Sequence, residues 1–212
     1  MYRNFEKLNE VKQQRILEAC IQEFAEKGYE NASTNVIIKD AEISKGILFH
    51  YFGNKKSLFL YVVEHCLQFF ISEYRKYPRQ LSGDILDRIL ELGMIKLKIT
   101  HANPKMSKLV LHAYMNTPKD IRTEIHSKYA KLSNDLLPSI FEDIDVSVFR
   151  NGVDPKKALE MVMLFLAALQ EKYTKAYVGR EQELLGDMEK IMEEYSEYVD
   201  ILKYGMYAHQ LT

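Results

Sequence analysis

The chain has 212 residues, of which 47% are hydrophobic and 28% are charged, and its formal net charge at pH 7 is −1. These values are typical of one or two globular domains with hydrophobic cores. They exclude a generic polyanion-binding protein, so any binding to nucleic acid must depend on the local placement of charge.

The sequence carries no pattern of a signal peptide or a membrane span. The first residues, MYRNFEKLNEVKQQ, are charged and lack the apolar core of a signal peptide. The longest apolar-dense run, residues 159–169, is too short to span a bilayer. Cys20 and Cys66 lie within helical patterns and outside metal-ligand spacings, which favours two buried thiols over a disulfide. We therefore expect a cytoplasmic protein without membrane contact.

Apolar residues recur at helical spacing along the chain, and strand-like alternation is lacking, so we predict an all-α fold of about nine helices. The first long helix should cover residues 10–27 and end at Gly28. Its inward stripe should consist of Leu17, Cys20, Ile21 and Phe24. Two shorter helices should follow, over residues 35–41 and from Ser44 to about residue 50, with Thr34 and Ser44 as their N-caps.

Asparagine, proline and a loop-like stretch mark the later boundaries. Asn54 should cap a fourth helix, which should end before the linker-like residues 75–83. After a helix that begins near residue 85, another should start at Pro104. Thr117 and Pro118 predict the N-cap and first residue of the next helix, and Pro138 should kink or end it.

The last two long helices carry more apolar surface than the core of one subunit requires. The helix expected at residues 155–178, opened by Asp154, is apolar nearly all round, so it should be buried on more than one side. The final helix should end near Tyr204, before Gly205, and its apolar residues are spaced alternately by four and three. We predict a dimer interface at Leu166, Leu184, Met188, Ile191, Tyr195, Tyr198 and Leu202; packing inside one subunit is the alternative.

Residues 34–59 have the layout of a helix-turn-helix DNA reader. Such a reader inserts the N-terminal end of a short helix into the major groove and holds phosphates with flanking groups. Ser44, Lys45 and Gly46 suit this role, since Gly46 has no side chain to hold DNA away. Lys55 suits phosphate contact because free N–H groups at a helix start accompany its charge. An ordinary loop glycine and a solvated lysine are the alternatives.

In combination, these motifs resemble the DNA-binding domain of the tetracycline-repressor (TetR) family of bacterial transcriptional regulators. The resemblance covers residues 10–62 and rests on Ile16, Ala19, Phe24, Gly28, Tyr29, Thr34, Ile37, Ala41, Ile43, Ser44, Lys45, Gly46, Leu48, Phe49, His50, Tyr51, Phe52, Lys55 and Leu58. It implies a DNA-binding domain at residues 1–54 and a ligand-binding and dimerisation domain at residues 55–212.

The resemblance also implies roles for individual residues. Contacts to the DNA backbone would come from Thr34, Ser44, Tyr51 and Lys55, and the recognition helix would contain Lys45, Gly46, Leu48, Phe49 and His50. The last two helices would form a four-helix bundle with those of a second copy. Two residues depart from the family pattern. Ile38 replaces an alanine and must be repacked, and Glu42 replaces a turn glycine, which requires a left-handed backbone.

A ligand pocket among the central helices is a further implication of the resemblance. Its candidate lining residues are Met94, Met106, Leu109, Tyr114, Met161, Phe165, Leu169 and Tyr173, for which simple core packing is the alternative. Because the sequence reveals no isolated buried charge, we expect an apolar or weakly polar effector.

Motifs of catalysis and metal binding are missing. None of the six histidines lies in a metal-ligand spacing, and the sequence has no nucleophile-elbow, dinucleotide or Walker pattern. We therefore expect no enzyme activity, no catalytic residue, no metal and no cofactor. An enzyme and a helical protein-interaction module are the competing classes. The sequence favours a ligand-responsive transcriptional regulator, by family expectation a repressor, that binds a palindromic operator as a homodimer and is released by a small molecule.

Overall fold

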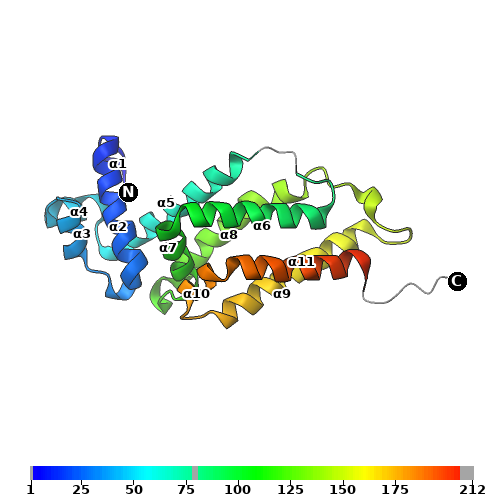
Figure 1. Cartoon of the computed structure of the whole chain (residues 1–212). Coiled ribbons are helices and arrows are strands. Elements are labelled where there is room, and N and C mark those ends of the chain that lie inside the picture. Colours follow the sequence, from blue (N-terminus) through cyan, green and yellow to red (C-terminus); the bar gives the residue numbers. More distant parts are fainter. Residues whose placement is uncertain (1, 78–80, 206–212) are drawn as a thin grey trace. The chain divides into compact units, whose positions relative to one another are not determined.

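The computed structural model describes residues 2–77 and 81–205, and every regular element within them is helical (Figure 1). The elements are α1 (Arg3–Glu6), α2 (Glu10–Asn31), α3 (Thr34–Asp40), α4 (Lys45–Phe52), α5 (Lys55–Arg75), α6 (Ile85–Ala102), α7 (Pro104–Met115), α8 (Lys119–Phe141), the 3-10 turn η1 (Val146–Val148), α9 (Pro155–Ala176), α10 (Glu181–Gly186) and α11 (Met188–Tyr204). The all-α prediction is confirmed. The predicted linker lies between α5 and α6, and its residues 78–80 are outside the described part of the chain.

The described residues pack as two compact units. The first unit contains the described residues of Met1–Ser72 and Asn103–Ser133, and the second unit contains those of Glu73–Ala102 and Asn134–Thr212. Helix α7 and the first part of α8 therefore pack with the N-terminal helices. The expected division at residue 54 concerns functional modules rather than packing, and it stays a prediction.

One continuous hydrophobic core fills the first unit. It contains the predicted stripe of α2, together with Phe5 of α1, Leu58 of α5 and Ile121 of α8, all of them buried. Cys20 and Cys66 are free thiols in this core, as the sequence predicted, and burial raises the pKa of both to about 12. Because the thiolate is the reactive form, neither cysteine is suited to redox chemistry.

Gly28 was predicted to end the helix, but it only interrupts α2, which continues beyond it to Asn31. Its backbone has φ 67° and ψ −178°, a conformation that side chains with a Cβ rarely adopt. A Cβ at this position would lie only 2.5 Å from Cε1 of His112, on α7. Both the backbone conformation and the close approach of α7 therefore require glycine here.

Three predicted N-caps are confirmed by their hydrogen bonds. The side chain of Ser44 accepts from the N–H of Ile47, that of Asn54 from Ser57, and that of Asp154 from Lys156, at 3.3, 2.8 and 2.9 Å. These short polar side chains satisfy backbone donors that the first helical turn leaves unpaired.

Other predicted boundaries were wrong. Ser33, rather than Thr34, occupies the N-cap position of α3, because its N–H is already held by the Glu23 carboxylate at 2.7 Å. The Thr117 hydroxyl donates to the Ala113 carbonyl instead of capping α8, which begins at Lys119. Pro138 does not end α8, which continues to Phe141, and the alternative of a kink at Pro138 stays a prediction.

The expected single C-terminal helix is divided into α10 and α11 at Asp187. Gly205 then ends α11 with φ 85°, as predicted, and its N–H donates to the carbonyl of Ile201. Among the described residues, no helix combines the length and the hydrophobicity that a bilayer crossing requires.

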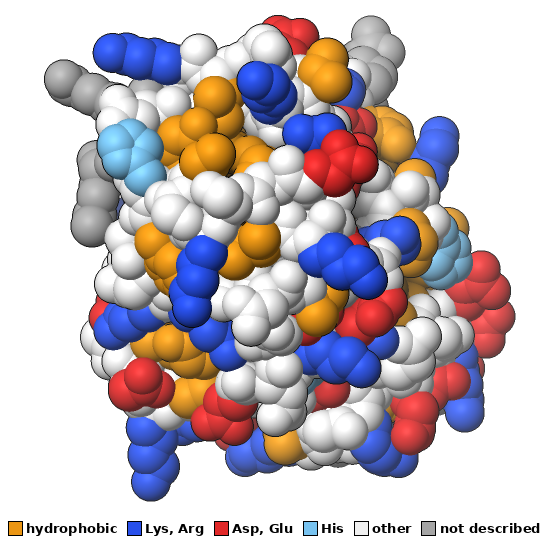
Figure 2. Space-filling view, turned by 90° about the vertical axis from the view of Figure 1, so that its left-hand side faces the viewer, with side chains coloured by type: hydrophobic (Ala, Val, Ile, Leu, Met, Phe, Trp, Pro, Cys, Tyr) orange, Lys and Arg blue, Asp and Glu red, His pale blue; other side chains and the backbone are white. Residues whose placement is uncertain are grey.

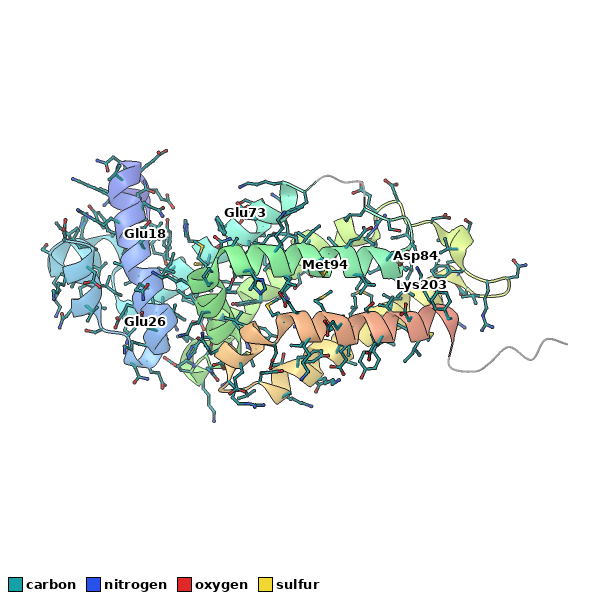
Figure 3. All side chains as sticks on the ribbon, viewed as in Figure 1. Glu18, Glu26, Glu73, Asp84, Met94 and Lys203 are labelled. Atoms are coloured by element: carbon teal, nitrogen blue, oxygen red, sulfur yellow. The ribbon has the colours of Figure 1, made fainter. Side chains whose placement is uncertain are left out.

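In the second unit, α6, α9 and α11 pack along one another (Figure 1) around a small core. Gly93 of α6 allows α11 to come close, since a Cβ there would lie 2.5 Å from Cε of Met192. Lys203, near the end of α11, lies beside Asp84 (Figure 3) and pairs with Asp84 at 3.2 Å and Asp87 at 2.6 Å. The two helices are thus held together by close packing near the middle of α6 and by an ion pair near its start.

Buried Arg88 closes the other side of this core. Its guanidinium donates to the carbonyl oxygens of Ser82 at 2.7 Å and Ile140 at 3.1 Å, and also to that of Glu142. A buried cation is costly unless its donors are satisfied. Arg88 meets this requirement by holding the end of α8 and the loop that follows it.

Candidate nucleic-acid interface

Helices α3 and α4 are anchored to the first unit from one side only. Ile37 of α3 and Leu48 and Phe52 of α4 are at most 1% exposed and belong to the core of the first unit. The exposed residues of α4 include Lys45, Gly46 and His50. Because the core holds the helix pair from behind, this outward surface is preorganised.

The N-terminus of α4 is open to a ligand. A Cβ added to Gly46 would meet only the Ser44 Oγ, at 4.0 Å, so the fold leaves free space at this position. The backbone N–H groups of a first helical turn attract anions such as phosphate. Figure 2 shows a face on which lysine and arginine side chains lie among hydrophobic and acidic ones. Glycine at position 46 is therefore explained by access from outside rather than by packing.

Glu42, in the turn between α3 and α4, has the left-handed backbone that the sequence predicted, with φ 52°. Its carboxylate pairs with Nη1 of Arg15 on α2 at 2.6 Å. The pair is solvent-exposed, so it contributes at most about 1 kcal/mol to stability. It nevertheless neutralises the negative charge that Glu42 would bring to a DNA-binding surface. Ile38 packs half-buried against the core of the first unit.

Lys55 and Lys56, at the start of α5, both have protein partners. Nζ of Lys55 donates to the Glu30 carbonyl at 2.9 Å and lies 5.3 Å from the centre of the Tyr29 ring. Burial lowers the pKa of Lys55, against the attraction of nearby carboxylates. Lys56 pairs with Glu124 of α8 at 2.6 Å, and this hydrogen bond raises the pKa of Lys56. A phosphate would therefore have to share or replace these partners.

The remaining expected DNA contacts surround α4. Thr34 is the first residue of α3 and is half-buried. Tyr51 packs edge-to-face on Phe5, with ring centres 5.9 Å apart. Nε2 of the exposed His50 lies 3.2 Å from the amide nitrogen of Asn4. The structure thus gathers the expected residues on and around the helix-turn-helix.

Leu48 requires a correction. Its side chain is 0% exposed and belongs to the core, so it anchors α4 and cannot contact a nucleic acid. Sequence reasoning instead missed Val36 on α3 and Ile47 on α4, which are 40% and 42% exposed. No local signal singled them out, because each lies next to another apolar residue that could equally have faced the core.

The eight residues expected to line a ligand pocket are divided between the two units. Met106, Leu109 and Tyr114 lie in the first unit, where Leu109 is buried in the core. The second unit holds Met94, Met161, Phe165, Leu169 and Tyr173. Met94, on α6 (Figure 3), and Met161 are 55% and 62% exposed. A small cavity of about 20 Å³ in the first unit is lined by other residues, namely Glu64, Leu67, Gln68, Lys128, Lys131 and Leu132.

The residues expected at a dimer interface lie on α9, α10 and α11. Tyr195 stacks on Tyr173 and Tyr198 packs against Phe165, each with ring centres 5.8 Å apart. Leu166 packs against the core of the second unit, Leu184, Met188 and Ile191 are half-buried, and Leu202 is 38% exposed. The apolar residues predicted to pack on a second copy are therefore partly covered by packing within one chain. The same helices also carry exposed hydrophobic residues that the sequence reasoning did not assign to an interface, namely Met161, Leu164, Ile201 and Tyr204.

The described residues contain no group of three or more histidine, cysteine, aspartate or glutamate side chains that could hold a metal ion.

Two family models match the chain. Residues 16–62 match the model described as "Bacterial regulatory proteins, tetR family". Residues 82–207 match the model described as "Tetracyclin repressor-like, C-terminal domain". The first match contains the complete helix-turn-helix, and the second contains α6 to α11.

Curated relatives of the chain are transcriptional regulators. The chain is 32% identical over 153 residues to IcaR, a negative transcriptional regulator of the biofilm operon icaADBC from Staphylococcus epidermidis, covering 72% of this chain and 78% of IcaR. It is 38% identical over 94 residues to an HTH-type transcriptional regulator of Staphylococcus aureus, covering 42% of this chain and 51% of the relative. HbdR of Aromatoleum is 30% identical over 77 residues, which are 36% of this chain and 32% of HbdR. The chain thus spans about half of one of these proteins and a third of another.

Solved structures share the fold over nearly the whole chain. A TetR family transcriptional regulator from Chloroflexus aurantiacus has a TM-score of 0.58 at 21% identity, with 98% of both chains covered. FadR from Bacillus subtilis, solved in complex with stearoyl-CoA, has a TM-score of 0.63 at 16% identity, covering 92% of this chain and 99% of FadR. At these identities the likeness concerns the fold alone.

Proposed function

We propose that this chain, which belongs to the TetR family of bacterial transcriptional regulators, binds a palindromic DNA operator as a homodimer and is released from it by a small-molecule effector. Its family and its relatives are regulators rather than enzymes, and the match to the helix-turn-helix supports DNA binding. The observation that carries the proposal is α4, which the core holds at Leu48 and Phe52 while its N-terminus remains open at Gly46.

In this proposal, α4 enters the major groove by its N-terminal end. Lys45 meets base edges or phosphates, and Gly46 allows the backbone to come close to the bases. Ser44, Thr34, Tyr51 and Lys55 hold the DNA backbone, while Phe49 and His50 extend the reading surface along α4. Contacts to phosphates fix the position of the helix, and contacts to base edges give specificity.

A second copy of the chain supplies the second reading head. Exposed apolar residues on α9 and α11, such as Leu164 at 65% and Ile201 at 44%, support pairing through these helices. Paired helix-turn-helix units read half-sites separated by one or more turns of DNA, which explains a palindromic operator. Repression is the mode we propose, because the relative IcaR is a negative regulator. The cytoplasm is the corresponding location.

The effector that we propose is apolar or weakly polar and binds among the C-terminal helices. The structural neighbour FadR was solved with stearoyl-CoA, which has a long apolar chain. Phe165, Leu169 and Tyr173, which lie together in the second unit, are the candidate lining residues that we retain. A coupling free energy of about 1–3 kcal/mol between effector and operator would change operator affinity roughly 5- to 150-fold.

The proposal is tested by binding to duplexes from the DNA upstream of its own gene, measured by fluorescence anisotropy across a salt series. Wild-type protein should bind one duplex specifically, and its affinity should fall steeply with salt because phosphate contacts release counterions. Gly46→Glu should fold normally but bind only at the non-specific level, roughly a thousand-fold weaker or more. Val148→Glu places the same charge on a residue that is 48% exposed in the second unit, and it should bind as wild type. Wild-type affinity in folded Gly46→Glu protein would refute the assignment of α4.

A further inference from the structure

Ile47, the third residue of α4, is a large hydrophobic side chain that the fold does not use. It is 42% exposed, whereas its neighbour Leu48 is 0% exposed and Phe52 is 1% exposed. The inner face of α4 is thus complete without Ile47. An exposed isoleucine at this position needs another explanation than core packing.

The surroundings of Ile47 are open and lie at the reading end of the helix. Lys45 is exposed, and Gly46 leaves free space beside the helix backbone. The N–H of Ile47 donates to Oγ of Ser44 at 3.3 Å, which fixes the residue in the first turn. Ile47 therefore projects from a capped, rigid helical turn with no bulky neighbour at position 46 to shield it.

The chemistry of the major groove offers one apolar partner to such a side chain. Base edges there present hydrogen-bond donors and acceptors, which isoleucine cannot match, and the C5-methyl group of thymine, which it can contact favourably. We infer that Ile47 reads thymine by its methyl group and so contributes to the choice of operator sequence. This inference rests on the proposed function, because it assigns specificity to the same DNA-binding surface.

Burial of a methyl group against an apolar surface is worth about a four-fold change in affinity. Two other apolar side chains could compete for this role. Val36 on α3 is 40% exposed, and Phe49 on α4 is half-buried. The test must therefore separate Ile47 from both of them.

The experiment replaces thymines in the operator one at a time by deoxyuridine, which keeps base pairing but removes the methyl group. The operator is first recovered by selecting duplexes that wild-type protein binds from a random pool. Wild-type protein should lose affinity about four-fold at one or more thymines in each half-site. Ile47→Ala should bind thymine and deoxyuridine duplexes equally at those positions. Val11→Ala, at a residue of α2 that is 79% exposed, is the matched control and should discriminate as wild type does.

Three results would overturn the inference. Discrimination that survives in Ile47→Ala, and is lost instead in Val36→Ala or Phe49→Leu, would assign the methyl contact to another residue. Specific binding by wild-type protein with no effect of any deoxyuridine would show that Ile47 does not read thymine, while the proposed function would stand. Failure to select any specific duplex, with the protein folded, would refute the proposed function and this inference together.

Discussion

In the first unit, α1, α2, α3, α4, α5, α7 and α8 each contribute at least one hydrophobic side chain that is at most 1% exposed. Among the described residues of the second unit, only Ile85 and Val199 are buried to this extent. The exposed large hydrophobics are distributed the other way. Val11, Val36 and Ile47 lie in the first unit, and Met94, Val146, Val148, Met161, Leu164, Val178, Ile201, Leu202 and Tyr204 lie in the second.

This difference indicates that the two units are stabilised in different ways. The first unit buries its apolar surface by itself, so the surface it presents can be shaped for DNA. The second unit leaves apolar side chains on α9 and α11 in water, where covering them would yield about 25 cal/mol for each Å² removed from solvent. We therefore expect the second unit to gain stability from a second copy, and the first unit to gain little.

The largest expected effect is on assembly. Leu164 is 65% exposed on α9, so Leu164→Glu should leave each subunit folded but place a charge where we propose that a second copy packs. We expect monomers in light scattering. Because a monomer holds only one half-site, operator affinity should fall roughly a hundred-fold or more. Val148→Glu, outside α9 and α11, should remain a dimer. An unchanged dimer mass for Leu164→Glu would place the interface elsewhere.

Two neighbouring residues of α4 should differ strongly in their contribution to stability. Leu48→Ala removes a fully buried side chain and should lower the free energy of unfolding by about 2–5 kcal/mol. Ile47→Ala removes an exposed one and should change it by less than about 0.5 kcal/mol. Urea denaturation followed by circular dichroism measures both. Equal losses would mean that α4 is rotated relative to the core, and that the outward face has been misassigned.

Where α2 contacts α7, any side chain at residue 28 should lower the free energy of unfolding. Gly28→Ala should cost roughly 1–3 kcal/mol, because φ is 67° and the new Cβ would lie 2.5 Å from the His112 ring. His112→Ala in the same protein should recover the steric part of this loss but not the backbone part. A double-mutant cycle on unfolding free energies gives the two parts. Strict additivity of the two substitutions would show that His112 does not limit this position.

The smallest effect on stability at neutral pH is expected for substitution of His65 on α5. Burial lowers the pKa of this half-buried histidine, so between its folded pKa and the unfolded value of about 6.5 the unfolded state binds more protons. Stability should therefore be unaffected at pH 7.5 and should decline as the pH falls below about 6.5. His65→Gln should flatten this decline in urea titrations between about pH 5 and pH 7. The same slope in both proteins would mean that other groups cause it.

Local signals in the sequence were sufficient for much of this fold. The apolar stripe of α2, the break in α2 at Gly28, the caps Ser44, Asn54 and Asp154, and the terminator Gly205 all act within a few residues of their position. Such features depend on short-range hydrogen bonds and backbone geometry.

The features that could not be predicted from the sequence depend on contacts between residues that are far apart in the chain. Ser33 replaces Thr34 as a cap position because Glu23 of α2 holds its N–H, and Lys56 finds Glu124 on another helix. Three consecutive apolar residues, Ile47 to Phe49, cannot reveal which one faces the core of so short a helix. The break between α10 and α11 lies inside a continuous apolar pattern, which predicts one helix.

The positions of the candidate DNA-binding residues could also be predicted from the sequence, but their interaction partners within the protein could not. The sequence placed Lys45 and Gly46 at the start of one short helix and Lys55 at the start of the next, and they begin α4 and α5 in the structure. It could not reveal that Lys55 is already held by Glu30, or that Glu42 is neutralised by Arg15. These pairs join residues that only the folded chain brings together.

The central claim is that the first unit binds DNA and the second unit pairs two copies of the chain. It is tested most directly by comparing binding to an isolated half-site with binding to the complete palindrome. Wild-type protein should be titrated by fluorescence anisotropy onto each duplex, with the stoichiometry of the complexes measured by light scattering. We expect two protomers on the palindrome and an affinity for the isolated half-site that is roughly a hundred-fold weaker or more. Equal affinities, with one protomer on each duplex, would contradict the account.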